Sequence, residues 1–448
     1  MDQSNIYPVR SRESSSRTKQ DAEHVRGFVR DSQRVFASCG IQTDIVIIGD
    51  GIAGMALAYV AGQNGLNSVI LGKDMPGATN SATGFLSARP DYMLRDRELV
   101  RRTAYECNRW KRIFYPQIIK PELFLIPIGP ELPKSVGKFE ALLDFYDKET
   151  KTRLSQLPSG YFKVNKASLE IREPNLKKDH FNGALVLWES IVDPNILLKN
   201  LYEIALNANK VLISKISGYT VKNNCIQEVF AEYGNKETLR LYNDKRPLLV
   251  VNAAGPWIPD IWKLFGISLP MELRIGVQAQ VLGQYLRSGI ITFGPDKKYV
   301  VCLQKNGYVQ VGPTNGTEDI EYLHSVFAKL IEAPVPEASF LKSGSRVKAF
   351  SADTQRPVIW SHRGNGIDNL YSLHPGKMVL ALLAADELLA KAKEDGWIKK
   401  SIPTLGNTYS LKGESRRGSY WKIRWLAIKS FTALAVYYLK FLLKQKPR

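Results

Sequence analysis

The sequence predicts an α/β fold with a second, α+β lobe, and three observations lead to this fold class. The chain has 448 residues, more than one hydrophobic core usually organises, so two lobes are expected. A β-branched apolar run at 44–48 is followed at once by a glycine turn, a helical pattern at 52–62 and a second apolar run at 68–71. Further along the chain, an antiparallel sheet is indicated by alternating apolar patterns at 276–282, 299–303 and 308–311.

The remaining elements are predicted from local patterns. A basic amphipathic helix covers 98–115, while 116–180 shows no dominant period and is assigned to the second lobe. Asp193 and Pro194 predict the start of a helix that extends to about 208, because the aspartate accepts backbone N–H bonds and proline stands where no N–H is needed. Short strands are predicted at 211–213, 225–231 and 239–242. A buried strand that ends in a tight glycine turn is predicted over 248–255, and the last helix over about 377–392.

The glycine turn after the first strand fits the pattern G-x-G-x-x-G. Gly49, Gly51 and Gly54 carry it, with Ile52 and Ala53 opening the helix. Glycines here permit a tight turn, a close approach of the backbone to a pyrophosphate and close helix packing, and the helix N-terminus favours phosphate. Because the motif lies between a buried strand and a helix, it predicts a Rossmann-like dinucleotide site; the alternative is a glycine-rich turn without a ligand.

The second strand lacks the acid that usually binds the adenosine ribose. That position, about 20 residues after the motif, holds Gly72, followed by Lys73 and Asp74. Either Asp74 or a backbone group replaces the missing carboxylate. An alternative is an NADP site with Lys73 on the 2′-phosphate.

Three further segments accompany the motif: Gly77–Gly84, Val250–Trp257, and Gly344-Ser345-Arg346 with Arg356–Ile359 downstream. With them, the sequence resembles the D-amino-acid-oxidase-like FAD-dependent oxidoreductases. Within that superfamily it is most similar to the catalytic subunit of anaerobic-type glycerol-3-phosphate dehydrogenases, over roughly residues 43–395. The resemblance implies a Rossmann-like FAD-binding domain with an inserted antiparallel-sheet substrate domain.

The resemblance also implies roles for single residues. Gly49, Gly51 and Gly54 would hold the FAD pyrophosphate, and Ala254 and Gly255 would close over the adenine side. The flavin and its phosphates would be lined by Thr79, Asn80 and Ser81, and the loop before the last helix would supply Gly376, Lys377 and Met378. His374 and Lys377 would add positive potential at the pyrimidine edge of the flavin; alternatively, both are solvated loop residues.

Arg346 matches the family's arginine that binds a substrate carboxylate or phosphate. Binding of this anionic group would orient the substrate so that its C–H faces flavin N5. The alternative partner of Arg346 is a structural acid such as Asp353. Arg89 is a second candidate, displaced from the family pattern, and Ser87 stands where glycerol-3-phosphate enzymes carry a histidine. No cysteine lies near 353–357, so the flavin is expected to bind without a thioether link.

The predicted domains are discontinuous. The FAD-binding domain comprises 41–115, 181–265 and 341–400, and the substrate domain 116–180 and 266–340. Residues 1–40 form a polar extension without the apolar run of a signal peptide and are expected to be disordered.

Charge and cysteine content limit the partners. A formal net charge of +19 indicates attraction to nucleic acid, anionic lipid or an anionic substrate, although no segment resembles a nucleic-acid-binding module. The four cysteines form no C-x-x-C pair, so neither a metal site nor a disulfide framework is expected, and a reducing, cytoplasmic compartment fits.

Residues 413–448 predict a basic amphipathic helix. Lys422, Lys429, Lys440 and Lys444 share one stripe at helical spacing, opposite a broad apolar face. Peripheral anchoring to an anionic membrane is expected; the alternatives are a helix docked on the protein itself and a basic nucleic-acid tail.

Three functions remain open from the sequence. The first is an FAD-dependent dehydrogenase of a small anionic alcohol, such as glycerol 3-phosphate or a 2-hydroxy acid, with a quinone or a protein as electron acceptor. The second is a flavin amine or amino-acid oxidase of the glycine-oxidase type, because an amine needs no strong base. The third is a flavin-binding protein without catalysis.

Overall fold

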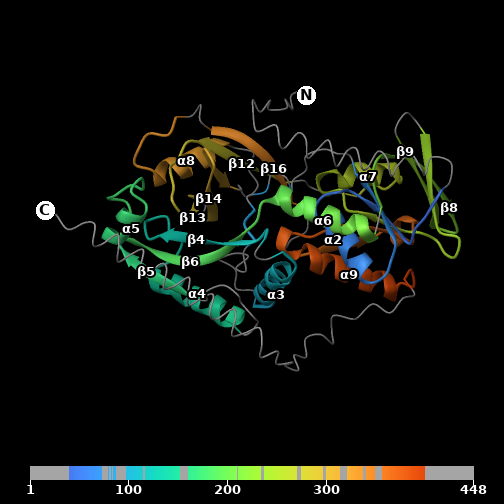
Figure 1. Ribbon diagram of the computed structural model, residues 1–448, viewed down its shortest axis with the longest axis horizontal. Helices are drawn as coiled ribbons and strands as arrows, with labels where there is room; N and C mark the ends of the chain where they lie inside the picture. The colour runs from blue at the N-terminus through green and yellow to red at the C-terminus, as the bar shows by residue number, and fades with distance from the viewer. Residues whose placement is uncertain are drawn as a thin grey trace. The chain divides into compact units, whose positions relative to one another are not determined.

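The computed structural model describes residues 40–72, 79, 82, 84–86, 97–114, 117–151, 160–208, 210–233, 237–269, 274–295, 299–312, 320–336, 340–348 and 356–398, all within one unit, Met1–Ile402. They are drawn as helices, strands and coloured coil in Figure 1. The expected extension before Gly40 and the expected helix at 413–448 lie outside the described residues. Among the helices that are described, none is both long enough and apolar enough to cross a membrane.

A six-stranded sheet carries the nucleotide motif, in the order β17-β18-β11-β2-β3-β7. The five strands from β18 to β7 are parallel, and β17 joins β18 antiparallel. In the centre, Val46 lies between Val250 and Val69, so the predicted buried strands pair directly. The strands are Ile45–Ile48 (β2), Ser68–Gly72 (β3), Lys210–Ile213 (β7), Leu249–Asn252 (β11), Val358–Ser361 (β17) and Leu370–His374 (β18).

Alternate residues of each strand face two different layers, which explains why β2 is apolar throughout. Ile45 and Ile47 pack into a core with helices α2, α6 and α9, whereas Val46 and Ile48 pack into a core with a second sheet. Fully burying each such side chain stabilises the fold by roughly 1.5–3 kcal/mol. The helices are Ile52–Gln63 (α2), Pro194–Ala208 (α6) and Ala381–Glu394 (α9), the last preceded by the 3-10 turn η4 (Met378–Leu380).

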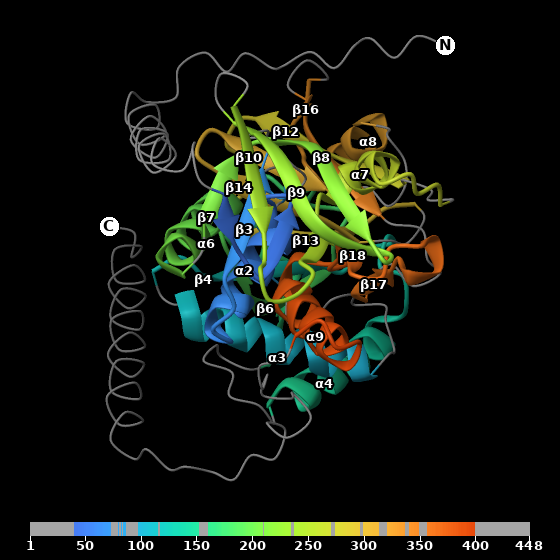
Figure 2. The same cartoon turned by 90° about the vertical axis from the view of Figure 1, so that its right-hand side faces the viewer.

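The second sheet on this lobe has four strands, ordered β1-β10-β9-β8: β8, β9 and β10 form an antiparallel meander, labelled in Figure 2, and β1 pairs in parallel with β10. Its strands are Ile41–Gln42 (β1), Lys215–Lys222 (β8), Cys225–Tyr233 (β9) and Glu237–Tyr242 (β10). Helix α7 (Ile258–Leu264), which follows the turn η1 (Gly255–Trp257), contributes Ile258, Ile261 and Trp262 to the same core. The turn η3 (Arg363–Asn365) precedes β18.

The other lobe is built on an eight-stranded sheet, ordered β16-β12-β15-β14-β13-β4-β6-β5. The predicted antiparallel sheet is confirmed, except that β13 and β4 pair in parallel. Its strands are Lys120–Pro127 (β4), Tyr161–Asn165 (β5), Gly183–Ile191 (β6), Arg274–Leu282 (β12), Gly289–Phe293 (β13), Tyr299–Lys305 (β14), Tyr308–Gly312 (β15) and Phe340–Lys348 (β16).

Helices cover both faces of this sheet. Figure 1 shows α8 (Ile320–Leu330) over β12 to β14, and α4 (Val136–Lys151) beneath β4 and β6. The short α5 (Lys166–Arg172) packs beside β5 and β6. Helix α3 (Arg97–Phe114) packs against both lobes. Its Val100 lies in the hydrophobic core between α4 and the eight-stranded sheet, and its Trp110 lies in the core that α2 shares with the six-stranded sheet.

Two details bear on the sequence analysis. Asp193 caps α6 as predicted, because its Oδ1 accepts the N–H groups of Asn195 and Ile196 at 2.9 and 3.3 Å. The predicted domain ranges remain a prediction, but β6 and β16, from the ranges 181–265 and 341–400, belong to the eight-stranded sheet rather than to the nucleotide-binding sheet.

Candidate flavin and substrate site

The turn between β2 and α2 leaves no room for a Cβ atom at two of its glycines, Gly49 and Gly54. Gly49 has a φ of +115°, and a Cβ there would lie 2.6 Å from the Ala253 carbonyl oxygen. A Cβ on Gly54 would lie only 1.9 Å from the carbonyl oxygen of Gly49. The protein's own packing therefore requires glycine at these two positions.

Gly51 is different, because no described residue demands a glycine there. Its φ of −73° suits any residue, and among the described atoms a Cβ would meet only the Thr79 hydroxyl, at 3.5 Å. The missing side chain leaves the backbone open above the first turn of α2, where the amides have no acceptor inside the helix. A pyrophosphate needs this combination of open backbone, N–H donors and positive helix dipole, so the residues present fit a dinucleotide.

Thr79 fixes the start of α2. Its Oγ1 accepts the N–H of Ile52 at 3.2 Å, and Ala82 donates its N–H to the Thr79 carbonyl at 3.0 Å. The segment then joins the other lobe, since Gly84 accepts the N–H of Val192 and Leu86 donates to Ser190. The contacts of Thr79, Gly84 and Leu86 together connect the nucleotide loop to the end of β6.

A pair of buried amide side chains completes this connection. Gln310 on β15 donates through Nε2 to Gln278 Oε1 on β12 at 2.9 Å, and the same nitrogen lies 3.5 Å from the Ala82 carbonyl oxygen. Both glutamines are less than a tenth exposed. The sequence analysis missed them; the available signal was a glutamine between two apolar residues that face the core, which places it on the opposite face of the sheet.

Arg346 is placed by strand register. It pairs with Gly276 on β12, two residues before Gln278. The predicted substrate arginine therefore belongs to β16, the strand that pairs with β12, which carries Gln278. Asp74, Asn80, Ser81 and Arg89 lie outside the described residues.

The Asn-Ala-Ala-Gly turn after β11 packs directly against the glycine loop. Ala253 donates its N–H to Ile48 at 2.8 Å. The buried Asn252 side chain donates to the Ile258 carbonyl and accepts the N–H of Ala254, and Gly255 has a φ of +57°. The predicted pair, Ala254 and Gly255, thus follows the strand that flanks the nucleotide loop.

The loop before α9 begins with His374, the last residue of β18. Its side chain is only 9% exposed, so the interpretation as a solvated loop residue is wrong for His374. Its Nδ1 accepts the N–H of Gly376 at 3.1 Å, which leaves the proton of a neutral ring on Nε2, as a donor. Lys377 and Met378 follow, and Trp110 of α3 supports the loop by donating to the Val379 carbonyl at 2.9 Å.

Helix α3 also carries a buried carboxyl group that faces α9. Burial raises the pKa of Glu106 from its ordinary 4.5 to about 8, opposed by Arg109, whose Nη1 lies 3.6 Å from Glu106 Oε2. Arg109 also pairs with Asp386 on α9, where burial likewise raises the pKa of the Asp386 carboxyl. Glu106, Arg109 and Asp386 thus form an ionic cluster between α3 and α9. The sequence analysis did not predict this cluster.

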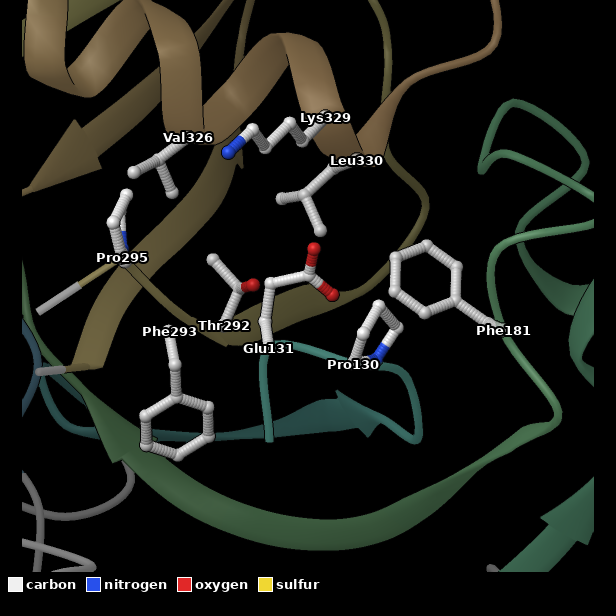
Figure 3. Close-up of a pocket in the computed structure, with 10 residues that line it drawn as sticks. Pro130, Glu131, Phe181, Thr292, Phe293, Pro295, Val326, Lys329 and Leu330 are labelled. Atoms are coloured by element: carbon white, nitrogen blue, oxygen red, sulfur yellow. The ribbon is translucent and has the colours of Figure 1, made fainter. Parts of the chain in front are cut away.

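A separate small cavity of about 170 Å³ lies in the substrate lobe (Figure 3). The Glu131 carboxylate, the Thr292 hydroxyl and the Lys329 side chain line it together with apolar residues. Glu131 Oε1 is 2.8 Å from His180 Nε2. The lining includes none of the predicted site residues, so this cavity is distinct from the glycine-loop site.

The glycine loop fits the pyrophosphate of a dinucleotide, and Thr79 and Ala82 join it to a sheet with buried polar groups. The chain belongs to the DAO family of FAD dependent oxidoreductases, whose profile matches residues 44–389. FAD is therefore the cofactor, and the NADP alternative is rejected.

Its relatives include glycerol 3-phosphate enzymes. A glycerol-3-phosphate dehydrogenase of Synechocystis is 20% identical over 422 residues, with 80% of this chain and 71% of the relative covered. The chain also matches alpha-glycerophosphate oxidases of Streptococcus, but spans only 36–37% of their length.

Two solved structures show the same fold. L-alpha-Glycerophosphate oxidase from Mycoplasma pneumoniae, with FAD bound, has a TM-score of 0.60 at 16% identity, with 81% of this chain and 97% of that chain covered. L-proline dehydrogenase from P. horikoshii has a TM-score of 0.59 at 19% identity, with 82% and 96% covered.

Proposed function

We propose that this chain oxidises a small anionic alcohol, such as glycerol 3-phosphate or a 2-hydroxy acid, by removing a hydride from its CH–OH carbon. FAD supplies the hydride acceptor, at N5 of the flavin. The observation that carries the proposal is the contact of Gln310 with Ala82, which brings β12 and β15 against the segment anchored to the nucleotide loop. The similarity to glycerol 3-phosphate enzymes supports the choice of substrate.

The chain's own residues would bind and orient the substrate. Arg346 would pair bidentately with the phosphate or carboxylate. The amides of Gln278 and Gln310 sit in a buried, water-poor position and would bind a hydroxyl group of the substrate. His374 would donate its Nε2 proton toward the pyrimidine edge of the flavin, where negative charge develops on reduction.

An amine or amino-acid oxidation is the second candidate, favoured by Ser87. Its position holds a histidine in the glycerol-3-phosphate enzymes that the sequence resembles, and a deprotonated amine loses hydride without such a base. The two candidates differ in their substrates, so one anaerobic experiment separates them.

The experiment is an anaerobic titration of the FAD-loaded protein, followed by the loss of flavin absorbance. We expect bleaching by glycerol 3-phosphate or a 2-hydroxy acid, and none by uncharged glycerol, which lacks the group for Arg346. Bleaching by amino acids alone would establish the second candidate. No bleaching by any of these compounds, with dithionite still reducing the flavin, would favour a flavin-binding protein without catalysis.

We further propose that residues 413–448 hold the enzyme on the cytoplasmic face of an anionic membrane, where a quinone or protein acceptor takes the electrons. The basic stripe with its aromatic, apolar face supports this proposal. Vesicles containing anionic lipid should co-sediment with the full chain and not with a chain ending at 412. Equal sedimentation of both would contradict the anchor.

A further inference from the structure

Strand β3 ends at Gly72, the position where this nucleotide-binding fold usually places an acid for the adenosine ribose. The neighbouring strand β2 runs parallel to it, with Ile48 opposite Leu71. The next residue, Gly49, donates its N–H to the Leu71 carbonyl at 2.8 Å. The glycine loop and the end of β3 are therefore held side by side at the carboxyl edge of the sheet.

The carboxylate of Asp50 fills the space beside Gly72. A Cβ built on Gly72 would lie 2.3 Å from Asp50 Oδ2, 2.6 Å from its Cγ and 2.8 Å from its Cβ. The first variable position of the motif thus brings an acid to the place that a side chain at residue 72 would occupy. The glycine and the aspartate depend on each other, because any side chain at 72 must displace the Asp50 carboxylate.

We propose that Asp50 is the residue that binds the adenosine ribose of FAD, in place of the acid missing from the end of β3. A carboxylate offers two acceptor oxygens to the ribose hydroxyls and makes charge-assisted hydrogen bonds with them. It also repels a phosphate on the 2′-oxygen, so the same residue selects FAD over a 2′-phosphorylated nucleotide.

The other described acid of this strand and turn lies far from Gly72. Asp44 lies at the amino end of β2, where it accepts hydrogen bonds from Arg246 at 2.7 Å and from the N–H of Asn67 at 3.0 Å. It belongs to the opposite edge of the sheet. Asp74 lies outside the described residues and is included as a variant in the test.

The test measures binding rather than catalysis. Apoprotein is titrated with FAD and with an FAD analogue that carries 2′-deoxyadenosine, and binding is followed by flavin fluorescence and calorimetry. We expect the wild-type protein to bind FAD roughly tenfold to a hundredfold more tightly than the analogue. Asp50→Asn should weaken FAD by a similar factor and bind the two ligands almost equally, whereas Asp74→Asn should discriminate as the wild type does.

Two outcomes with the wild type and the aspartate variants would overturn the proposal, and a third comes from Gly72→Ala. One is a wild-type protein that does not distinguish FAD from the deoxy analogue, a result that requires no variant to fold. The other is discrimination that survives Asp50→Asn and disappears in Asp74→Asn. Gly72→Ala provides a second variant, because its methyl group displaces the Asp50 carboxylate; it should lose discrimination while residue 50 is unchanged, and retained discrimination there also contradicts the proposal.

Discussion

Alanine at Gly54 is the most direct perturbation of the nucleotide loop. The added Cβ would lie 1.9 Å from the Gly49 carbonyl oxygen and 3.2 Å from Ile47 Cγ2. A backbone oxygen has no rotamer into which it can move. The turn between β2 and α2 must therefore open, and α2 must shift away from the sheet.

The expected magnitude follows from two opposing effects. Overpacking a well-packed site costs about 1–3 kcal/mol, and contact with backbone places Gly54→Ala at the upper end. Alanine gains about 1 kcal/mol over glycine inside a helix, and residue 54 belongs to α2. We expect the free energy of unfolding to fall by roughly 2 kcal/mol.

Gly51→Ala is the matched control, since it changes the same loop by the same methyl group. Its backbone conformation suits alanine, and the nearest atom of the described residues, Thr79 Oγ1, is 3.5 Å from the new Cβ. The loss of a favourable N-cap glycine costs roughly 1 kcal/mol or less. The methyl group would nevertheless stand where the pyrophosphate approaches, so FAD binding should weaken by about tenfold or more.

Urea unfolding of the two apoproteins and FAD titration of both measure these effects separately. We expect the stability loss to be larger in Gly54→Ala. In Gly51→Ala, affinity should be lost with little change in unfolding. An apoprotein of Gly54→Ala as stable as the wild type, or wild-type FAD affinity in Gly51→Ala, would refute the reasoning.

The remaining predictions concern pH, catalysis and the core. The native Glu106 carboxyl has a pKa of about 8, so it keeps a proton that the unfolded chain releases above pH 4.5. Its contribution to the free energy of unfolding is therefore full below pH 4.5 and is lost as the pH rises from 4.5 through 8. The loss is about 1.4 kcal/mol per pH unit in that window. Urea unfolding at pH 5 and 8.5 should show a smaller loss in Glu106→Gln than in the wild type or in the exposed control Glu203→Gln, and equal losses would be inconsistent with this assignment. Gln310→Leu should keep FAD but lower turnover at least tenfold, as measured by anaerobic single-turnover kinetics; unchanged turnover removes the amide pair from the site. Arg346→Ala should keep FAD and raise KM for an anionic substrate or abolish turnover, and wild-type kinetics would exclude it from the site. Asn252→Ala should lower the free energy of unfolding by roughly 2–3 kcal/mol in urea, because the buried Ile258 carbonyl and the half-buried Ala254 N–H lose their partner; a change under about 0.5 kcal/mol would show that these two groups find other partners.

The parallel sheet and its motif could be predicted because their signals are local. β2, β3 and β11 are short apolar runs followed by glycine turns, and such runs form strands that are buried on both faces. The capped start of α6 was likewise visible in Asp193 and Pro194. The sequence analysis missed β13, since Gly289–Phe293 is brief and carries no alternation. It also missed α8, although the buried residues Leu323, Val326, Phe327 and Leu330 follow the helical spacing i, i+3, i+4, i+7.

The polar contacts of the site depend on distances that no local pattern encodes. Gln310 meets Ala82 across 228 residues, through the packing of two lobes. Asp50 meets Gly72 because β2 and β3 pair in one particular register, and the motif alone gives no sign of it. The sequence could therefore identify the loop and the missing acid, but not the residue that fills its space.

A structure of the FAD complex tests the central claim most directly. The account predicts the pyrophosphate within hydrogen-bonding distance of the Ala53 and Gly54 amides, the adenosine ribose at Asp50, and the isoalloxazine beside Ala82 and Gln310. A flavin whose phosphates lie away from the first turn of α2, or whose ring does not reach β12 and β15, would contradict it.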